Sequence, residues 1–367
     1  MSAYPGSDQD RRVPVEPLQR FVHEVFEHCG MSADDAALLA DTLVKADLRG
    51  VHSHGVLRVP EYAKKLSGGG VDPKGEPRVA RDSGAALLVD GKNSMGQIAA
   101  NFAMRQAVER AKTTQVAVAS VGGSNHCGAM GYYATQALPE DMIGLASTNA
   151  LPTMAPWGGL DKILGMNPLA VAIPAGKERP IVHDAAFAAS AHGKIRVYAQ
   201  KGLPIPAHWA FDAEGHPTTD AVAAVEGLVQ PIGEFKGTGL ALVMGILTAV
   251  LAGAAFGTEL GSLKEGAQPG RDGHLFIAIR IAAFGDPETF KQSVDRIIQQ
   301  FKNSRRAEGV NRIYIPGEIE TETEQEYQQE GIPLNTTTLD GLRTTAAHVG
   351  AAPLDENYQP TDPNNKS

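Results

Sequence analysis

Apolar positions near the start of the chain follow the spacing of two amphipathic helices. Gly30 supplies the C-terminal signal that helices favour. Ser32 followed by Asp35 predicts a capping box for a second helix, which ends near Gly50. Five apolar residues share one face of the first helix: Leu18, Phe21, Val22, Val25 and Phe26. The pattern therefore predicts a helical N-terminal lobe.

Beyond about residue 80 the pattern changes to short apolar runs bounded by turn residues, which is typical of strands. Helices are expected over residues 97–113 and 286–304. The fold class predicted from this order is α+β, a helical lobe joined to a body built on a sheet. The predicted strands occupy residues 85–91, 115–123, 142–149, 169–175, 180–186 and 274–284.

The length of the chain predicts more than one core. A single core usually serves roughly 250 to 300 residues, and this chain has 367, so two lobes are expected. The predicted division is a loose start over 1–14, a helical lobe over 15–80, an α+β body over 81–315, a segment over 316–350 that packs back on the body, and a loose tail over 351–367.

One run without charge, from Leu240 to Phe256, tests whether the chain crosses a membrane. It has 17 residues and is rich in Ala and Gly, whereas a spanning helix needs about 20 predominantly apolar residues. We therefore predict a helix buried on all sides, at the centre of a domain or across a subunit contact, and no membrane partner.

Composition and charge narrow the class of partner. The chain has 33 basic and 42 acidic residues, a net charge of −9, so the electrostatic attraction that drives nucleic-acid binding is missing. Cys29 and Cys127 stand far apart and predict neither a disulfide framework nor a metal site. The first residues have no apolar core typical of a secretory signal, and a cytoplasmic protein is expected.

The stretch RGVHSHGVLRVPEY, residues 49–62, concentrates candidate chemistry. In a helix, His54, Arg58 and Tyr62 would project from one face, with Ser53 at its edge. A histidine exchanges protons near neutral pH, and an arginine fork fits a carboxylate. The alternative is a solvated amphipathic helix, and Pro60 would kink any helix that contains it beyond the first turn.

Further candidates stand at the ends of apolar segments. His126 lies in a glycine-rich turn after a predicted strand, where free backbone amides bind anions. Asn167, the pair His183 and Asp184, and Lys236 occupy similar places. The alternative for each is an ordinary turn or cap. The sequence has neither the glycine-rich dinucleotide fingerprint nor a P-loop, and no histidine spacing that predicts a metal site.

Six segments, taken in order, resemble the malate/L-lactate dehydrogenase family of NAD(P)-dependent oxidoreductases that lacks the Rossmann fold. The resemblance runs from about Glu16 to Glu318, and ADLRGVHSHGVLRVPEY is its most specific part. The others are SNHCGAMGYY, GMNPLAVAIP, GKI, PTTD and PIGEFKGTGLAL. It implies a cofactor domain with a largely antiparallel sheet in a homodimer. It also implies hydride transfer between NAD or NADP and C2 of a small 2-hydroxy or 2-oxo acid of malate, lactate, sulfolactate or ureidoglycolate type.

The resemblance also implies roles for single residues. His54, with Ser53 beside it, corresponds to the family's catalytic histidine, and His126 corresponds to a second histidine close to the substrate. Arg58 and Tyr62 correspond to the residues that hold the substrate carboxylate. Implied cofactor contacts fall on Ser124, Asn167, Val182, His183, Asp184, Lys236, Gly237, Gly317 and Glu318.

One segment departs from the family pattern. Where many relatives carry hydroxyl side chains after the aspartate, this chain has Phe187 and Ala188, which removes two hydrogen bonds to the cofactor unless Ser190 or His192 replaces them. Three alternatives stay open: a cyclic 2-imino acid reductase of the same family, a non-catalytic relative with weakened cofactor binding, and a hydrolase that uses Ser53.

Overall fold

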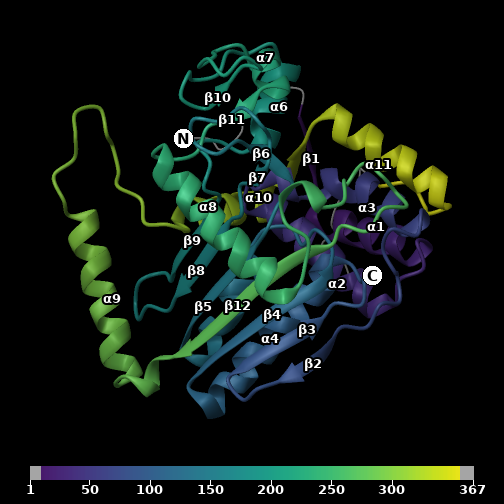
Figure 1. Cartoon of the computed structure of the whole chain (residues 1–367). Coiled ribbons are helices and arrows are strands. Elements are labelled where there is room, and N and C mark those ends of the chain that lie inside the picture. Colours follow the sequence, from purple (N-terminus) through teal and green to yellow (C-terminus); the bar gives the residue numbers. More distant parts are fainter. Residues whose placement is uncertain (1–9, 356–367) are drawn as a thin grey trace, which may run out of the picture.

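The helical lobe forms where the apolar spacing predicts it. The computed structural model describes residues 10–355 (Figure 1). Helices α1 (Val15–His28) and α2 (Ala33–Leu48) are joined by a tight turn at Gly30, whose φ of +92° suits glycine. The Ser32 side chain accepts a hydrogen bond from Asp35 N, which is the predicted cap.

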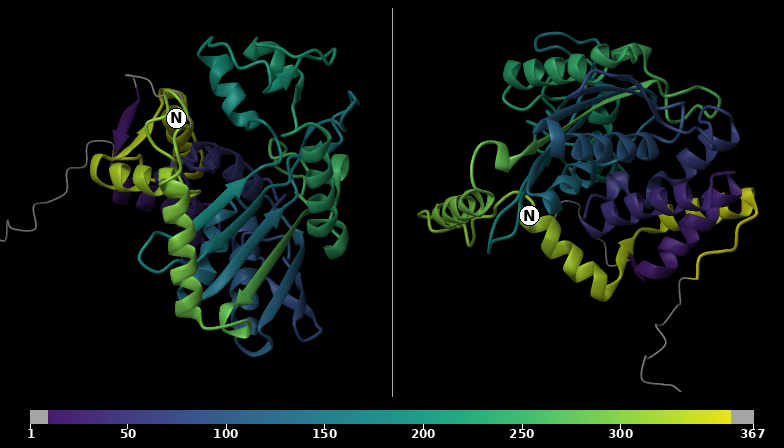
Figure 2. Two further views of the ribbon diagram at one scale, coloured as in Figure 1. Left: turned by 90° about the vertical axis from the view of Figure 1, so that its left-hand side faces the viewer. Right: turned by 90° about the horizontal axis from the view of Figure 1, so that it is seen from below.

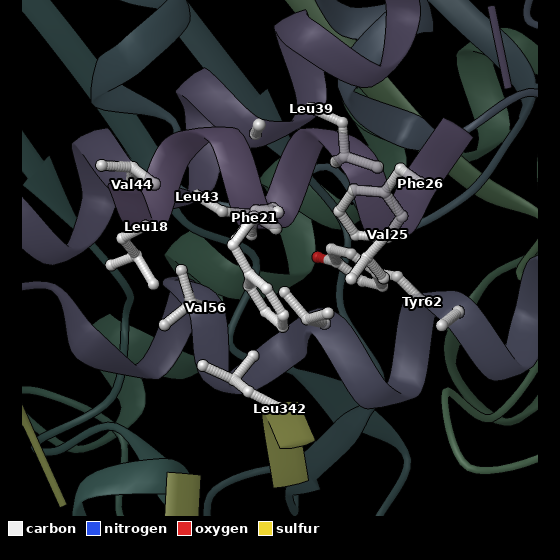
Figure 3. Packing of buried hydrophobic residues seen from close by; sticks show 14 of the residues in the cluster. Leu18, Phe21, Val25, Phe26, Leu39, Leu43, Val44, Val56, Tyr62 and Leu342 are labelled. Carbon is white, nitrogen blue, oxygen red and sulfur yellow. The ribbon is translucent and has the colours of Figure 1, made fainter. Parts of the chain in front are cut away.

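The C-terminal segment completes the core of this helical lobe. The strands β1 (Arg11–Val13) and β13 (Ile332–Leu334) pair antiparallel. The helix α11 (Thr336–Val349) buries Leu339 and Leu342 in the cluster that contains the apolar face of α1 (Figure 3). The prediction that this segment packs on the sheet body was therefore wrong for β13 and α11. Residues 11–13, expected to be loose, form a strand because β13 offers them an edge.

The body is built on a seven-stranded sheet with the order β2-β3-β4-β12-β5-β8-β9. All neighbours are antiparallel except β3 and β4, which are joined by α4 (Gly96–Thr114) as the crossover. The largely antiparallel sheet is confirmed. The strands are β2 (Arg78–Asp82), β3 (Ala86–Asp90), β4 (Val116–Ser124), β5 (Met142–Thr148), β8 (Leu169–Ile173), β9 (Ile181–Ala185) and β12 (Asp272–Arg280).

Helices cover both faces of the sheet. One face packs against α4 and α5 (Gly131–Ala134) through a core rich in alanine, and α8 (Phe235–Thr248) lies across the other face (Figure 2). A smaller cluster joins α6 (His192–Gln200) and α7 (Ala221–Glu226) to short strands. The remaining elements are β6 (Pro152–Met154), β7 (Leu164–Gly165), β10 (Ala210–Phe211), β11 (Leu228–Val229), α9 (Pro287–Lys302), α10 (Glu318–Glu330) and the 3-10 turns Thr135–Glu140, Val250–Ala252, Gly257–Glu259 and Ile281–Ala283.

Within one chain the helix α8 is buried on one side only, so burial on all sides would need a contact between subunits. Its small residues Gly237, Ala241 and Gly245 face inward, and the Ala241 carbonyl accepts a hydrogen bond of 2.7 Å from Asn167 Nδ2. By length and composition alone, Phe235–Ala252 is the one helix within the described chain that is long and apolar enough to cross a membrane. Its large residues face outward: Leu240, Leu242, Val243, Ile246, Leu247, Val250 and Leu251 are all exposed.

Candidate active site

The segment 49–62 is not the single helix that its spacing predicts. It forms two 3-10 turns, η1 (His52–His54) and η2 (Val56–Arg58), followed by the helix α3 (Val59–Ser67). Pro60 falls in the first turn of α3, where its missing N–H costs no hydrogen bond. The proline therefore begins a helix and does not kink one.

A buried carboxylate holds the two turns in place. Asp47, at the end of α2, accepts a 2.7 Å hydrogen bond from Val56 N and bonds His52 Nδ1 at 2.7 Å. A side chain at Gly55 would collide with this carboxylate. Asp47 thus fixes the backbone on both sides of the catalytic motif, and sequence reasoning missed it.

His54 and Arg58 lie together around Ser53. The Ser53 hydroxyl and His54 Nδ1 are 2.8 Å apart. Arg58 Nε donates to the Ser53 carbonyl at 2.8 Å, and Arg58 Nη1 bonds Glu61 at 2.6 Å. Because two sides of the guanidinium are held by the protein, its remaining N–H groups are pre-oriented for a carboxylate.

His126 joins the same group from the other lobe. Its ring stacks on His54 with centroids 5.6 Å apart and an interplanar angle of 12°. The Tyr62 hydroxyl lies 2.6 Å from His126 Nδ1. The structure therefore brings together all five residues that the sequence predicted for catalysis and substrate binding.

The contacts of Tyr62 change its predicted role. Its ring packs in the core of the helical lobe with Val25 and Phe26 (Figure 3), and the residue is only 1% exposed. Its hydroxyl bonds His126 and accepts a 3.2 Å hydrogen bond from Gln97 Nε2. Tyr62 lies behind His126, which leaves Arg58 as the predicted residue for the substrate carboxylate.

The pKa of both stacked histidines is lowered, which favours the neutral form of each ring. Burial, and after it the positive charge of Arg58, lowers the pKa of His54 to about 3. Burial, Arg58 and the neighbouring histidines lower the pKa of His126 well below its usual value. A neutral imidazole offers one lone pair and one N–H, so the pair can accept a proton and donate a hydrogen bond.

Two predicted cofactor residues are engaged inside the protein. Ser124 is fully buried, and its hydroxyl lies 2.8 Å from His274 Nε2. Asn167 is buried at a φ of +37°, where its side-chain oxygen accepts from Ala150 N at 2.9 Å. Both side chains hold loops, so the polar turn or cap, which was the alternative interpretation, describes them better.

Other predicted cofactor residues share the edge strand β9. Val182 N donates to the Pro316 carbonyl at 2.9 Å, which places Gly317 beside this strand. His183 and Asp184 are exposed, and the Asp184 carboxylate accepts from Gly131 N at 2.7 Å.

Glu318 is buried near this edge and forms an ion pair of 2.6 Å with Lys302. A buried, paired carboxylate supports the fold of this region, and contact with a cofactor is left to its exposed neighbours.

The departure at Phe187 and Ala188 is explained by packing. Both side chains are buried in the cluster under α6 and α7. The Phe187 carbonyl accepts from Ile232 N at 3.2 Å, and a side chain at Gly237 would collide with Ile232. The segment therefore runs directly beside the start of α8 and the exposed Lys236.

This second region fits an anionic cofactor group. Within residues 10–355, the buried hydroxyl oxygens of Ser190 and Thr238 have no hydrogen-bond partner. Lys236 precedes Thr238 in the first turn of α8, whose N-cap Glu234 makes no side-chain cap hydrogen bond. A positively charged, uncapped helix start is a suitable phosphate site.

A cavity of about 750 Å³ opens beside Ser53 and Arg58. The helix α6 forms one wall, and a Cβ at Gly193 would lie 3.4 Å from Ser53 Cβ. Arg196, one turn further along α6, lines the same cavity. No cluster of potential metal ligands occurs among residues 10–355.

Comparison with known proteins agrees with these features. Residues 13–343 match the family model described as malate/L-lactate dehydrogenase. The chain is 37% identical to an L-sulfolactate dehydrogenase of Methanocaldococcus jannaschii, over 91% of this chain and 96% of that protein. It is 32% identical to an NAD(+) ureidoglycolate dehydrogenase of Escherichia coli, over 88% and 92%.

Solved structures agree with the fold. The sulfolactate dehydrogenase of Methanocaldococcus jannaschii superimposes with a TM-score of 0.88 at 36% identity, covering 94% of this chain and 99% of that one. A malate dehydrogenase from Pyrococcus horikoshii gives 0.87 at 34% identity, with 95% and 99% covered.

Proposed function

The chain belongs to the malate/L-lactate dehydrogenase family and is a nicotinamide-dependent oxidoreductase of 2-hydroxy acids, and we propose that His54 transfers the substrate proton while His126 donates a hydrogen bond to the substrate oxygen. The observation that carries this proposal is the stacked pair of histidines beside Arg58, and the lowered pKa of each ring favours its neutral form. A neutral imidazole is the form that accepts the proton of a hydroxyl group.

The residues act in a defined order when a hydroxy acid is oxidised. Arg58 binds the carboxylate and fixes the position of C2. A bound NAD or NADP, held by the residues of β9 and α8, would supply the acceptor for the hydride of C2. His54 takes the hydroxyl proton on Nε2, for which its Nδ1–H must donate to the Ser53 hydroxyl. His126 donates a hydrogen bond to the substrate oxygen, and the reverse steps reduce a 2-oxo acid.

Replacement of His54 tests the assignment. The variant His54→Ala is expected to lower kcat by about 10²- to 10⁴-fold with a working 2-oxo acid. Turnover within about threefold of the wild type would contradict the role of His54, because acid–base help is worth far more. His348→Ala, an exposed histidine on α11, serves as the control.

We propose that residues on α8 and near β9 hold the cofactor. Lys236 with Gly237 is placed at the phosphates, and His183, Asp184 and Gly317 along the remainder of the cofactor. NADH or NADPH at about 100 times its Kd should stabilise the fold by about 2.7 kcal/mol. If neither cofactor raises the free energy of unfolding, a non-catalytic relative would be favoured.

The proposed substrate carries a second acidic group. Arg196 is a second cation in the cavity lining besides Arg58, and two negative groups on a substrate suit two such cations. Arg196→Leu should raise the KM for oxaloacetate about 10- to 100-fold and leave that for pyruvate unchanged. The exposed Arg105→Leu is the control, and equal effects on both acids would exclude the second contact.

We further propose a cytoplasmic homodimer. The outward row of large apolar residues on α8 would be costly in water, and a second copy of the chain provides a matching apolar surface.

A further inference from the structure

A fully buried glutamine lies behind the histidine pair. Gln97 stands at the second residue of α4, and its Nε2 donates to the Tyr62 hydroxyl at 3.2 Å. Its Oε1 is buried and has no hydrogen-bond partner in the part of the chain that is described. Burying an amide oxygen without a partner costs free energy, so the position requires a reason.

The direction of the hydrogen bonds gives a reason for the buried position of Gln97. Because Gln97 Nε2 donates to the Tyr62 oxygen, the Tyr62 proton is free to point at His126 Nδ1, 2.6 Å away. That nitrogen must then accept. A neutral imidazole that accepts on Nδ1 carries its proton on Nε2.

We propose that Gln97 is a positioning residue which, through Tyr62, fixes His126 as the neutral tautomer with a proton on Nε2. This inference rests on the proposed function, since it explains how His126 presents a hydrogen-bond donor to the substrate oxygen. Gln97 itself touches neither substrate nor cofactor.

The start of α4 supports the same state of His126. A side chain at Gly96 would collide with the backbone of Asn125 and His126, so the helix begins directly against this turn. The positive end of a helix disfavours a second positive charge nearby. Gly96 and Gln97 together therefore hold His126 close, uncharged and in one tautomer.

Two substitutions of Gln97 separate the effect of hydrogen-bond direction from the effect of side-chain packing. In Gln97→Glu the introduced carboxylate accepts the Tyr62 proton, so Tyr62 must accept from His126 and the proton moves to Nδ1. In Gln97→Met the shape is kept and no hydrogen bond is made, so Tyr62 can either donate to His126 or accept from it. The readout is the ¹⁵N chemical shift of both ring nitrogens of His126, together with the pH profile of kcat.

We expect the Nε2–H tautomer in the wild type, both tautomers in Gln97→Met, and the Nδ1–H tautomer in Gln97→Glu above the pKa of its carboxyl group. With the donor lost, kcat of Gln97→Glu should fall by about 100-fold as pH rises, while KM changes little. Gln136→Glu is the matched control, because its side chain also bonds α4, at Asn101.

An Nδ1–H tautomer in the wild type, or the same tautomer in the wild type and Gln97→Glu from pH 5 to 10, would overturn the inference. The spectrum needs no turnover, so its result is independent of the proposed reaction. A protein without turnover on any 2-oxo acid would contradict the function and leave the tautomer measurable.

Discussion

Arg58 has two proposed effects on the candidate site: it would bind the carboxylate, and its charge adds to burial in lowering the pKa of His54. In Arg58→Met the pKa of His54 should rise toward its usual value. Oxidation needs neutral His54, so the acid limb of kcat/KM should move to higher pH. KM for the hydroxy acid should rise about 10- to 100-fold, the value of a charged hydrogen bond. The measurement is the pH profile of kcat/KM.

Arg110→Met is the control for this experiment. Arg110 lies on α4, where it forms an ion pair with Asp82. An acid limb that stays at the wild-type pH in Arg58→Met, with KM raised, would show that Arg58 binds substrate without affecting His54.

The turn that carries Ser53 and His54 depends on Asp47. Removal of one partner from a buried charged hydrogen-bond pair costs about 3 to 5 kcal/mol, and Asp47 bonds both Val56 N and His52. Asp47→Ala should therefore destabilise the helical lobe by about that amount. The measurement is urea unfolding, with the exposed Asp340→Ala as control. A loss equal to that of the control would show that the turns hold their shape without the carboxylate.

Apolar spacing predicted most regular elements because it is a local property of the chain. The strand expected over 115–123 is β4 at Val116–Ser124, and the helix expected over 97–113 is α4 at Gly96–Thr114. The motif around His54 was predicted as one helix. Its shape depends on Asp47, whose bonds to the turns no periodicity reveals.

The roles of Tyr62 and Gln97 were missed for a similar reason. The resemblance placed Tyr62 near the substrate, and only the packing shows its hydroxyl turned toward His126 and Gln97. Gln97 looked like the first residue of an ordinary helix. The single signal in the sequence was the pair Gly96 and Gln97 after a turn, which is too common to indicate a site.

Three histidines make the whole fold sensitive to acid. His274 is fully buried, and burial lowers its pKa to about 3. Desolvation also lowers the pKa of the half-buried His54 and His126. In the unfolded chain these groups bind protons below about pH 6.5, so stability is present above that pH and is lost as pH falls toward 3. Proton uptake by His274 in the unfolded chain should alone lower the free energy of unfolding by about 2 kcal/mol between pH 7 and pH 5.

The urea midpoint measured from pH 7.5 to pH 5 checks this expectation. The pH dependence of stability measures the number of protons taken up on unfolding, and in His274→Gln this number should fall by about one. In His348→Gln, on the surface, it should stay unchanged. A pH dependence that His274→Gln leaves at its wild-type size would show that His274 titrates normally.

The assembly of the molecule decides what covers α8. The 17-residue run was expected to be buried on all sides, and within one chain only its small residues are buried. Sequence cannot separate burial within a chain from burial between chains, because both need apolar side chains. The large residues point outward in a row, which is the arrangement of a surface that meets another surface.

A charge placed in this row should separate the subunits. Val243 is 54% exposed at the middle of α8, so Val243→Glu leaves the inner face intact and puts a carboxylate into the proposed contact, where its desolvation opposes association. We expect a dimer for the wild type and a monomer for Val243→Glu in analytical ultracentrifugation. Val222→Glu, on α7 and 61% exposed, should remain dimeric. A monomeric wild type, or a Val243→Glu protein that stays dimeric, would place the contact elsewhere.

Since Lys236 lies in the first turn of the same helix, loss of the dimer should also weaken cofactor binding, and titration with NADH or NADPH measures that link.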